Sequence, residues 1–145
     1  MGTLNKGRGG VVGTGQYVGR TKWARAYYDF ATDGGAIGAI NLRGDMIPSG
    51  AVILNTVIRV ATAVTSGGAA TVSLGVEAAT DTRAAATLAT APALSTTGVK
   101  PGAVTNAAPT ETTADRHVVA TIAAFALTAG RFSVLVEYVE LSPAV

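Results

Sequence analysis

"AVTSGGAATVSLGVE", residues 63–77, is the stretch that decides the fold, because an apolar run lies on either side of Gly67 and Gly68. Along the second run, apolar residues alternate with small or polar ones. The apolar positions are Ala70, Val72, Leu74 and Val76, and the positions between them are Thr71, Ser73 and Gly75. A period of two is typical of a half-buried antiparallel strand. We therefore predict a strand, a tight turn at the glycines and a second strand, arranged as a β-hairpin.

Similar strand signals occur elsewhere in the chain. The residues rich in β-branched and apolar side chains predict strands at 36–42, 51–64, 117–127 and 131–141, with turns at 44–50 and 128–130. In the last strand one face is apolar and consists of Phe132, Val134, Val136 and Tyr138. The opposite face still carries Leu135 and Val139. We expect that face to meet a partner chain or a loop.

Residues 78–116 are rich in Ala and Thr and contain three prolines. A short helix at 82–89 and a loop with short edge strands both fit this composition. We interpret the segment as a long excursion between two sheet layers. Six to eight strands with little helix predict an all-β fold, an antiparallel β-sandwich.

The composition favours a structural role. The chain has 28 Ala, 20 Thr and 18 Gly, so small residues make up 66 of its 145 positions. Charged residues are 14% of the chain, against roughly 25% in ordinary soluble domains. Such a weakly charged exterior suggests burial against other subunits. The absence of Cys excludes disulfides and thiolate chemistry.

The basic charge is concentrated at the N-terminus. Residues 1–28 carry five basic side chains and no acidic one, whereas the remainder has six basic and nine acidic side chains. Seven glycines fall within residues 1–19. We predict an extended N-terminal arm over 1–25 and a β-sandwich domain over 26–145. The arm either has no role or orders against a neighbouring subunit with an acidic surface.

"RTKWARAYYDF" (20–30) holds four of the eight aromatic residues, Trp23, Tyr27, Tyr28 and Phe30. A short helix and an extended segment both fit the spacing of Trp23 and Tyr27. Basic residues interleaved with aromatics are able to bind single-stranded nucleic acid by stacking. In a chain with few aromatics, packing anchors are the more economical interpretation, so we do not expect a nucleic-acid partner.

No motif predicts catalysis, a cofactor or a metal. His117 is the single histidine, and Asp115 beside it lacks a serine elbow to complete a triad. The carboxylates of Asp29, Asp33 and Asp45 have no calcium-loop spacing. The tripeptide "RGD" at 43–45 falls in a turn, where Gly and Asp are favoured for geometry. "GRGGVVGTG" fits neither the dinucleotide fingerprint nor the P-loop.

No targeting signal is evident. "MGTLNKGRGG" lacks the apolar core of a signal peptide, and no apolar run reaches the length of a membrane span. We expect synthesis in the cytoplasm and no membrane partner.

The sequence resembles a known family in three segments: "YYDFATDGGAIGAINL", "IPSGAVILNTVIRVATAVTSGGAATVSLGVE" and "ALTAGRFSVLVEYVEL". Over residues 27–141 these are similar to head decoration, or cement, proteins of tailed bacteriophages. The resemblance implies a jelly-roll-like β-sandwich with no enzymatic activity. It also implies a virion protein on the capsid surface that clamps adjacent major capsid proteins, often as a homotrimer at threefold sites. Similar sandwiches occur in head fibres and tail components.

From the residues and this resemblance we predict one interface and no catalytic, cofactor or metal site. The candidate capsid and subunit contacts are Lys6, Arg8, Arg20, Lys22, Trp23, Arg25, Tyr27 and Tyr28. The alternative is a carbohydrate-binding or adhesion β-sandwich on the virion. The lack of any aromatic residue in 78–116 counts against sugar binding.

Overall fold

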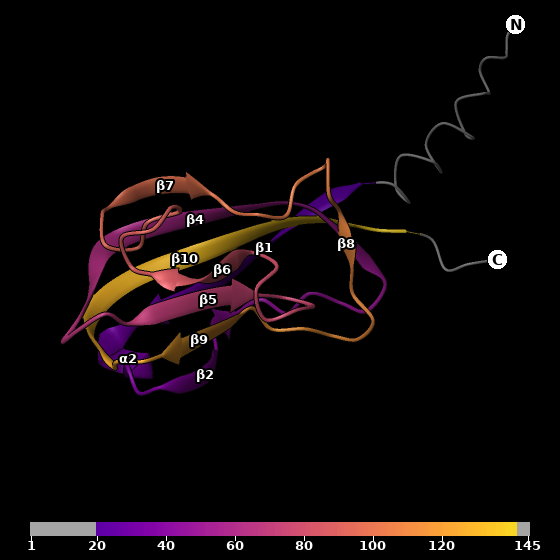
Figure 1. Cartoon of the computed structure of the whole chain (residues 1–145). Coiled ribbons are helices and arrows are strands. Elements are labelled where there is room, and N and C mark those ends of the chain that lie inside the picture. Colours follow the sequence, from indigo (N-terminus) through magenta and orange to yellow (C-terminus); the bar gives the residue numbers. More distant parts are fainter. Residues whose placement is uncertain (1–19, 142–145) are drawn as a thin grey trace, which may run out of the picture.

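The structure, a computed structural model, describes residues 20–141 as two packed antiparallel sheets (Figure 1). The larger sheet contains β1 (Thr21–Asp29), β3 (Arg43–Gly44), β4 (Ala51–Ser66), β7 (Gly98–Pro101), β8 (Thr110–Glu111) and β10 (Leu127–Glu140). The smaller sheet contains β2 (Gly38–Asn41), β5 (Thr71–Gly75), β6 (Arg83–Thr87) and β9 (Val119–Ala123). A single helical turn, α2 (Phe30–Asp33), is capped by the side chain of Asp29. The predicted all-β sandwich is confirmed.

The strand order is that of a jelly roll. The larger sheet has the order β3-β1-β10-β4-β7, with β8 paired to β4, and the smaller has the order β2-β9-β5-β6. In each sheet, strands from the start, middle and end of the described chain lie side by side. This is the arrangement that two Greek keys produce in a jelly roll. The pairing of β1 with β10 places Thr21 opposite Val139, so the beginning and end of the described chain are neighbours.

The hairpin predicted at Gly67 and Gly68 is wrong. Both strands exist, but β4 pairs with β10, β7 and β8, whereas β5 pairs with β6 and β9. The glycine turn therefore carries the chain from one sheet to the other. The physical reason lies in the core: Val64 of β4 and Val72 of β5 are both buried between the layers. The sheets turn these two apolar faces toward each other across the sandwich.

Of the two alternatives considered for 78–116, the loop with short edge strands is confirmed, because residues 83–87 form β6 at the edge of the smaller sheet and pair with β5, and the short helix at 82–89 is absent. The turn predicted at 128–130 is wrong, because these residues belong to β10, which begins at Leu127 and pairs irregularly with β4 at this end. The chain reverses instead after β9, where Ala124 has a φ of 70°.

Arg83 explains why residues 82–89 do not form a helix. Its side chain is 1% exposed, and its guanidinium donates only to backbone carbonyls. The acceptors are the carbonyl oxygens of Val72, Ala84, Ala86, Thr87, Thr90 and Pro92. Burial lowers the pKa of this guanidinium. One charged group thus ties β5 and β6 to the loop that follows them.

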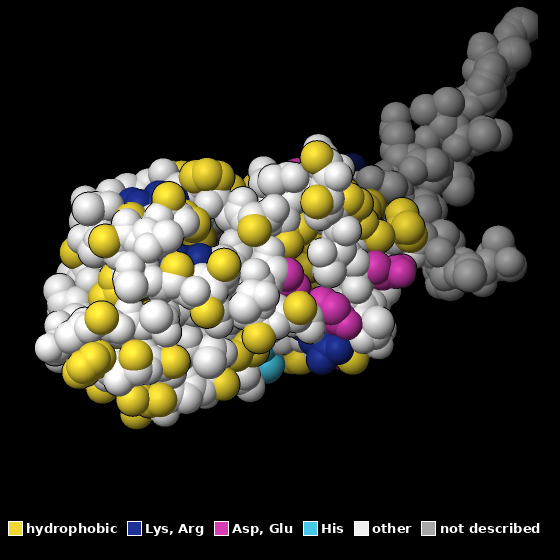
Figure 2. Space-filling view, viewed as in Figure 1, with side chains coloured by type: hydrophobic (Ala, Val, Ile, Leu, Met, Phe, Trp, Pro, Cys, Tyr) yellow, Lys and Arg dark blue, Asp and Glu magenta, His cyan; other side chains and the backbone are white. Residues whose placement is uncertain are grey.

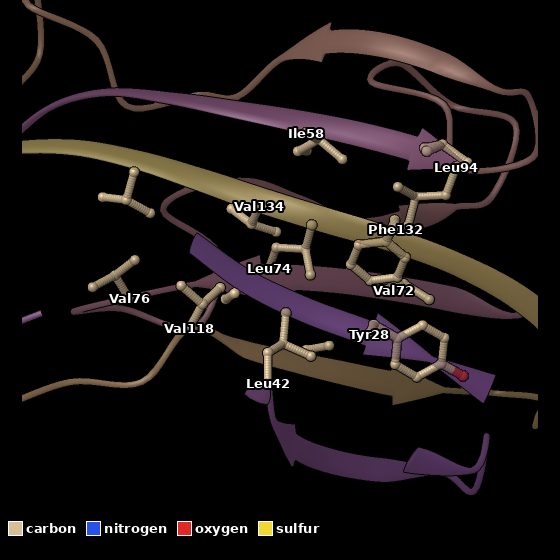
Figure 3. Packing of buried hydrophobic residues seen from close by; sticks show 14 of the residues in the cluster. Tyr28, Leu42, Ile58, Val72, Leu74, Val76, Leu94, Val118, Phe132 and Val134 are labelled. Atoms are coloured by element: carbon tan, nitrogen blue, oxygen red, sulfur yellow. The ribbon is translucent and has the colours of Figure 1, made fainter. Parts of the chain in front are cut away.

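The core lies between the layers and is built from Val, Ile, Leu and Ala with three aromatic rings, those of Tyr28, Phe132 and Tyr138 (Figure 3). The rings of Tyr28 and Phe132 stack with centroids 5.0 Å apart. Burial in β10 alternates as predicted, with Phe132, Val134, Val136 and Tyr138 on the inner face. This alternation sends the remaining side chains of the long strands to the outer surface.

Candidate interface on the outer face of the larger sheet

The aromatic and basic residues predicted to form an interface lie in or beside β1. Thr21–Asp29 is a strand, which decides between the two conformations considered for this stretch. Residues 21–25, assigned above to the arm, are therefore part of the sheet. Lys6 and Arg8 lie outside the described residues, and Arg20 directly precedes the strand.

The strand divides the candidate residues between its two faces. Trp23 is 51% exposed and Tyr27 is 41% exposed, and Arg25 lies between them on the same outer face. Lys22 is exposed near the sheet end, where its ammonium lies 2.9 Å from a carboxylate oxygen of Glu140. The hydrogen bond to Glu140 raises the pKa of Lys22. An exposed pair of this kind contributes little stability.

Tyr28 is not an interface residue. It is 1% exposed, and its hydroxyl donates to the carbonyl of Gly34 at 2.7 Å. Burial raises the pKa of this hydroxyl to about 12. Alternation along the strand is the cause, because Tyr28 shares the inner face with Ala24 and Ala26. The packing interpretation therefore holds for Tyr28, whereas Trp23 and Tyr27 remain available on the surface.

Strand register extends this outer face across the sheet. Tyr27 lies opposite Ser133 in β10, and Ser133 lies opposite Arg59 in β4. In the adjacent row, Arg25 lies opposite Leu135 and Leu135 opposite Val57. The half-buried Leu135 thus lies between the charged Arg25 and the apolar Val57 on this face. Arg59 and Val57 were not among the predicted interface residues.

A groove of about 380 Å³ opens on this face. Its lining residues are Tyr27, Tyr28, Asp29, Arg43, Arg59, Ala61, Arg131, Phe132 and Ser133. Arg43 is held by Asp33 through hydrogen bonds of 2.8 and 3.2 Å. These bonds lower the pKa of the Asp33 carboxyl. The arginines of the neighbouring strands, Arg59 and Arg131, are exposed in the same groove.

The "RGD" tripeptide is exposed, and both of its charged side chains have partners within the described chain. Arg43 is bound to Asp33, and the carboxylate of Asp45 accepts a hydrogen bond from the backbone of Arg25. Asp29 caps the helical turn through Ala31. Within residues 20–141 no group of three His, Cys, Asp or Glu side chains is placed to hold a metal ion.

A second hollow, of about 430 Å³, lies at the other sheet and includes His117. Asp115 accepts from the backbone of Ser49 rather than from the imidazole, and His117 Nδ1 is buried without a partner in the described chain. Nearby, hydrogen bonds from Arg116 and then Thr113 lower the pKa of Glu77 to about 2. These contacts tie the end of β5 to residues 113–116.

The exposed face formed by β5, β6 and β7 is dominated by uncharged side chains (Figure 2). Acidic side chains gather at one end of it, toward β8. No helix among the described residues is long and apolar enough to cross a membrane.

Comparisons with known proteins give a fold relationship. No protein-family model and no curated protein matches the sequence. Among solved structures, a chain in the acidic stable capsid structure of Helicobacter pylori bacteriophage KHP30 is 21% identical, with a TM-score of 0.59 over 84% of this chain and 89% of that one. A chain in the cyanophage Pam1 capsid asymmetric unit is also 21% identical, with a TM-score of 0.59 over 87% and 88%. The described sandwich therefore shares its fold with chains found in phage capsids.

Proposed function

We propose that this chain is a virion structural protein, a decoration or cement protein. It binds the outer surface of the assembled phage head and stabilises contacts between major capsid proteins. The observation that carries the proposal is the similarity to chains in two phage capsid structures, which spans most of both chains in each case. A match of that extent pairs this protein with whole chains of similar size. The role is structural and not enzymatic.

The outer face of the larger sheet supplies the contacts in this proposal. Trp23 and Tyr27 are large aromatic side chains with half or nearly half of their surface exposed, and Arg25 lies between them. Aromatic and arginine side chains are the residues most enriched in binding hot spots. In this proposal the basic side chains of the arm, Lys6 and Arg8, add contacts to the capsid or to a neighbouring copy. A homotrimer would match a threefold lattice site.

The test is binding of purified full-length protein to heads of the encoding virus prepared without it. We expect saturable co-sedimentation, weakened about tenfold or more by Trp23→Ala combined with Tyr27→Ala. Ile37→Ala is the matched control, because Ile37 is 60% exposed but lies beside the smaller sheet. Deleting residues 1–19 is expected to leave the fold intact and weaken attachment.

Absence of head binding by the full-length protein would overturn the proposal, and selective binding on a glycan array would then favour the adhesion alternative. Light scattering across dilution tests the oligomer separately. A stable trimer supports a preassembled clamp, whereas a monomer that still binds heads contradicts the trimer alone.

A further inference from the structure

The groove on the outer face holds two arginines whose donors are unused by the rest of the described chain. Arg59 in β4 and Arg131 in β10 are both exposed. Within residues 20–141 neither guanidinium takes part in a hydrogen bond or an ion pair, in contrast to Arg43 at the groove edge. The guanidinium groups of Arg59 and Arg131 therefore line one groove, and their N–H donors are available to bind a ligand.

The two guanidinium groups line the same groove. Arg59 lies opposite Ser133, and Arg131, two positions before Ser133 on the same face of β10, lies opposite Thr62, with a register shift between Arg131 and Phe132. Tyr27 flanks Ser133 on the other side, so an exposed aromatic ring borders the pair. The groove thus combines two guanidinium groups with one apolar surface.

The chemistry favours carboxylate ligands on a protein. A guanidinium presents parallel donors that match a carboxylate in a bidentate geometry. Phosphates fit the same fork, but binding to a nucleic-acid backbone depends on many neutralised phosphates. Here Asp29 lines the groove and Glu137 lies on the same sheet face, which keeps the local positive charge small. A short acidic segment of a protein suits this charge better than a nucleic-acid backbone.

We propose that the groove binds an extended acidic segment of the partner protein, with Asp or Glu carboxylates on Arg59 and Arg131. An apolar neighbour in that segment packs on Tyr27. The inference rests on the proposed function, since the partner is the capsid, and it adds a site centred on β4 and β10 to the contacts of β1. Because the groove is open to solvent, the affinity falls as salt rises.

The first test uses the full-length protein and a short labelled polyglutamate peptide at low ionic strength. Polyglutamine and oligothymidylate of the same length serve as comparison probes. We expect wild type to bind polyglutamate, and Arg59→Gln and Arg131→Gln each to bind about tenfold more weakly. Lys100→Gln is the matched control, because it removes one positive charge outside the groove. Thermal melting checks that each variant is folded.

The proposal would be overturned if both arginine variants bound polyglutamate as tightly as wild type does. It would also be overturned if Lys100→Gln weakened binding as much as the arginine variants do. Tighter binding of oligothymidylate through the same arginines would also overturn it and assign the groove to nucleic acid. Head binding separates this inference from the proposed function. If wild type binds heads and Arg59→Gln and Arg131→Gln bind them equally well, the groove is excluded while the capsid role stands. If wild type binds polyglutamate but no heads, the proposed capsid partner fails.

Discussion

Replacing Arg83 tests whether one buried cation organises the edge of the smaller sheet. Its guanidinium is buried, hydrogen bonds only to backbone carbonyls, and donates to Pro92 O at 2.9 Å and to Thr90 O at 3.0 Å. No other described hydrogen bond reaches these two loop carbonyls. Arg83→Met keeps a long apolar stem but leaves both acceptors unsatisfied. A second variant, Arg83→Lys, retains the charge and part of the donor capacity.

The magnitude follows from the two loop carbonyls. Both hydrogen bonds are part-buried, and a hydrogen bond from a charged donor contributes about 1.5–3 kcal/mol, so the pair contributes about 3–6 kcal/mol at most. Removing a buried charge offsets part of that loss. We expect Arg83→Met to lower the free energy of unfolding by about 2–4 kcal/mol, a large part of the roughly 5–15 kcal/mol of a typical domain. Arg83→Lys should fall between Arg83→Met and wild type.

The assay is urea unfolding followed by circular dichroism and by the fluorescence of Trp23, the single tryptophan. Arg59→Met is the matched control, because it makes the same substitution at an exposed arginine and should change stability by about 0.5 kcal/mol or less. A loss below about 1 kcal/mol in Arg83→Met would refute the reasoning. It would mean that the desolvation of the guanidinium cancels its hydrogen bonds to the loop.

Three other predictions concern a pH dependence, a close approach and a buried hydroxyl. Hydrogen bonds from Arg116 lower the pKa of Glu77 from 4.5 to about 2. The contribution of ionised Glu77 to the free energy of unfolding is therefore fully present above pH 4.5 and is lost as the pH falls through about 2. Wild type should have a higher urea midpoint than Glu77→Gln at pH 7, and the two midpoints should converge near pH 2. A Cβ at Gly75 would lie 1.9 Å from a backbone carbonyl oxygen, whereas one at Gly67 would meet nothing within 4 Å. Gly75→Ala should therefore strongly lower the melting temperature, and Gly67→Ala, the control, should leave it unchanged. Tyr28→Phe removes a part-buried hydrogen bond and should cost about 1 kcal/mol in urea unfolding, and an unchanged midpoint would contradict this.

Local periodicity predicted the strands well, and long-range pairing accounts for most of what it missed. The alternation of Val72 and Leu74 identifies β5, but two glycines specify only that the chain turns. Whether the next strand joins the same sheet depends on partners far away in the sequence. Here β4 pairs with β10, about seventy residues downstream, and β5 pairs with β9. The error at Gly67 is therefore one of topology and not of secondary structure.

The candidate interface shows the same division. Treating 21–29 as a strand would have separated Tyr27 from Tyr28 by parity, since the alanines at 24 and 26 mark the inner face. That signal was present in the sequence. Arg59 and Arg131 carried no comparable signal, because 72 positions separate them and only the register of β4 with β10 places them together. Arg83 was also unpredictable, because a charged residue in an Ala-rich stretch is ordinarily solvated.

The jelly-roll topology makes the outer face a product of register and not of any local motif. Tyr27, Ser133 and Arg59 come from the start, end and middle of the described chain and form one row. A slip of one residue between β10 and its neighbours would exchange every inward and outward side chain, burying Leu135 and exposing Val134. The packing of the inward side chains, Phe132 and Val134 among them, therefore sets the strand register. That register determines which residues form the row on the outer surface. A binding face assembled in this way tolerates changes in the 78–116 excursion only as long as the packing behind β10 holds the register.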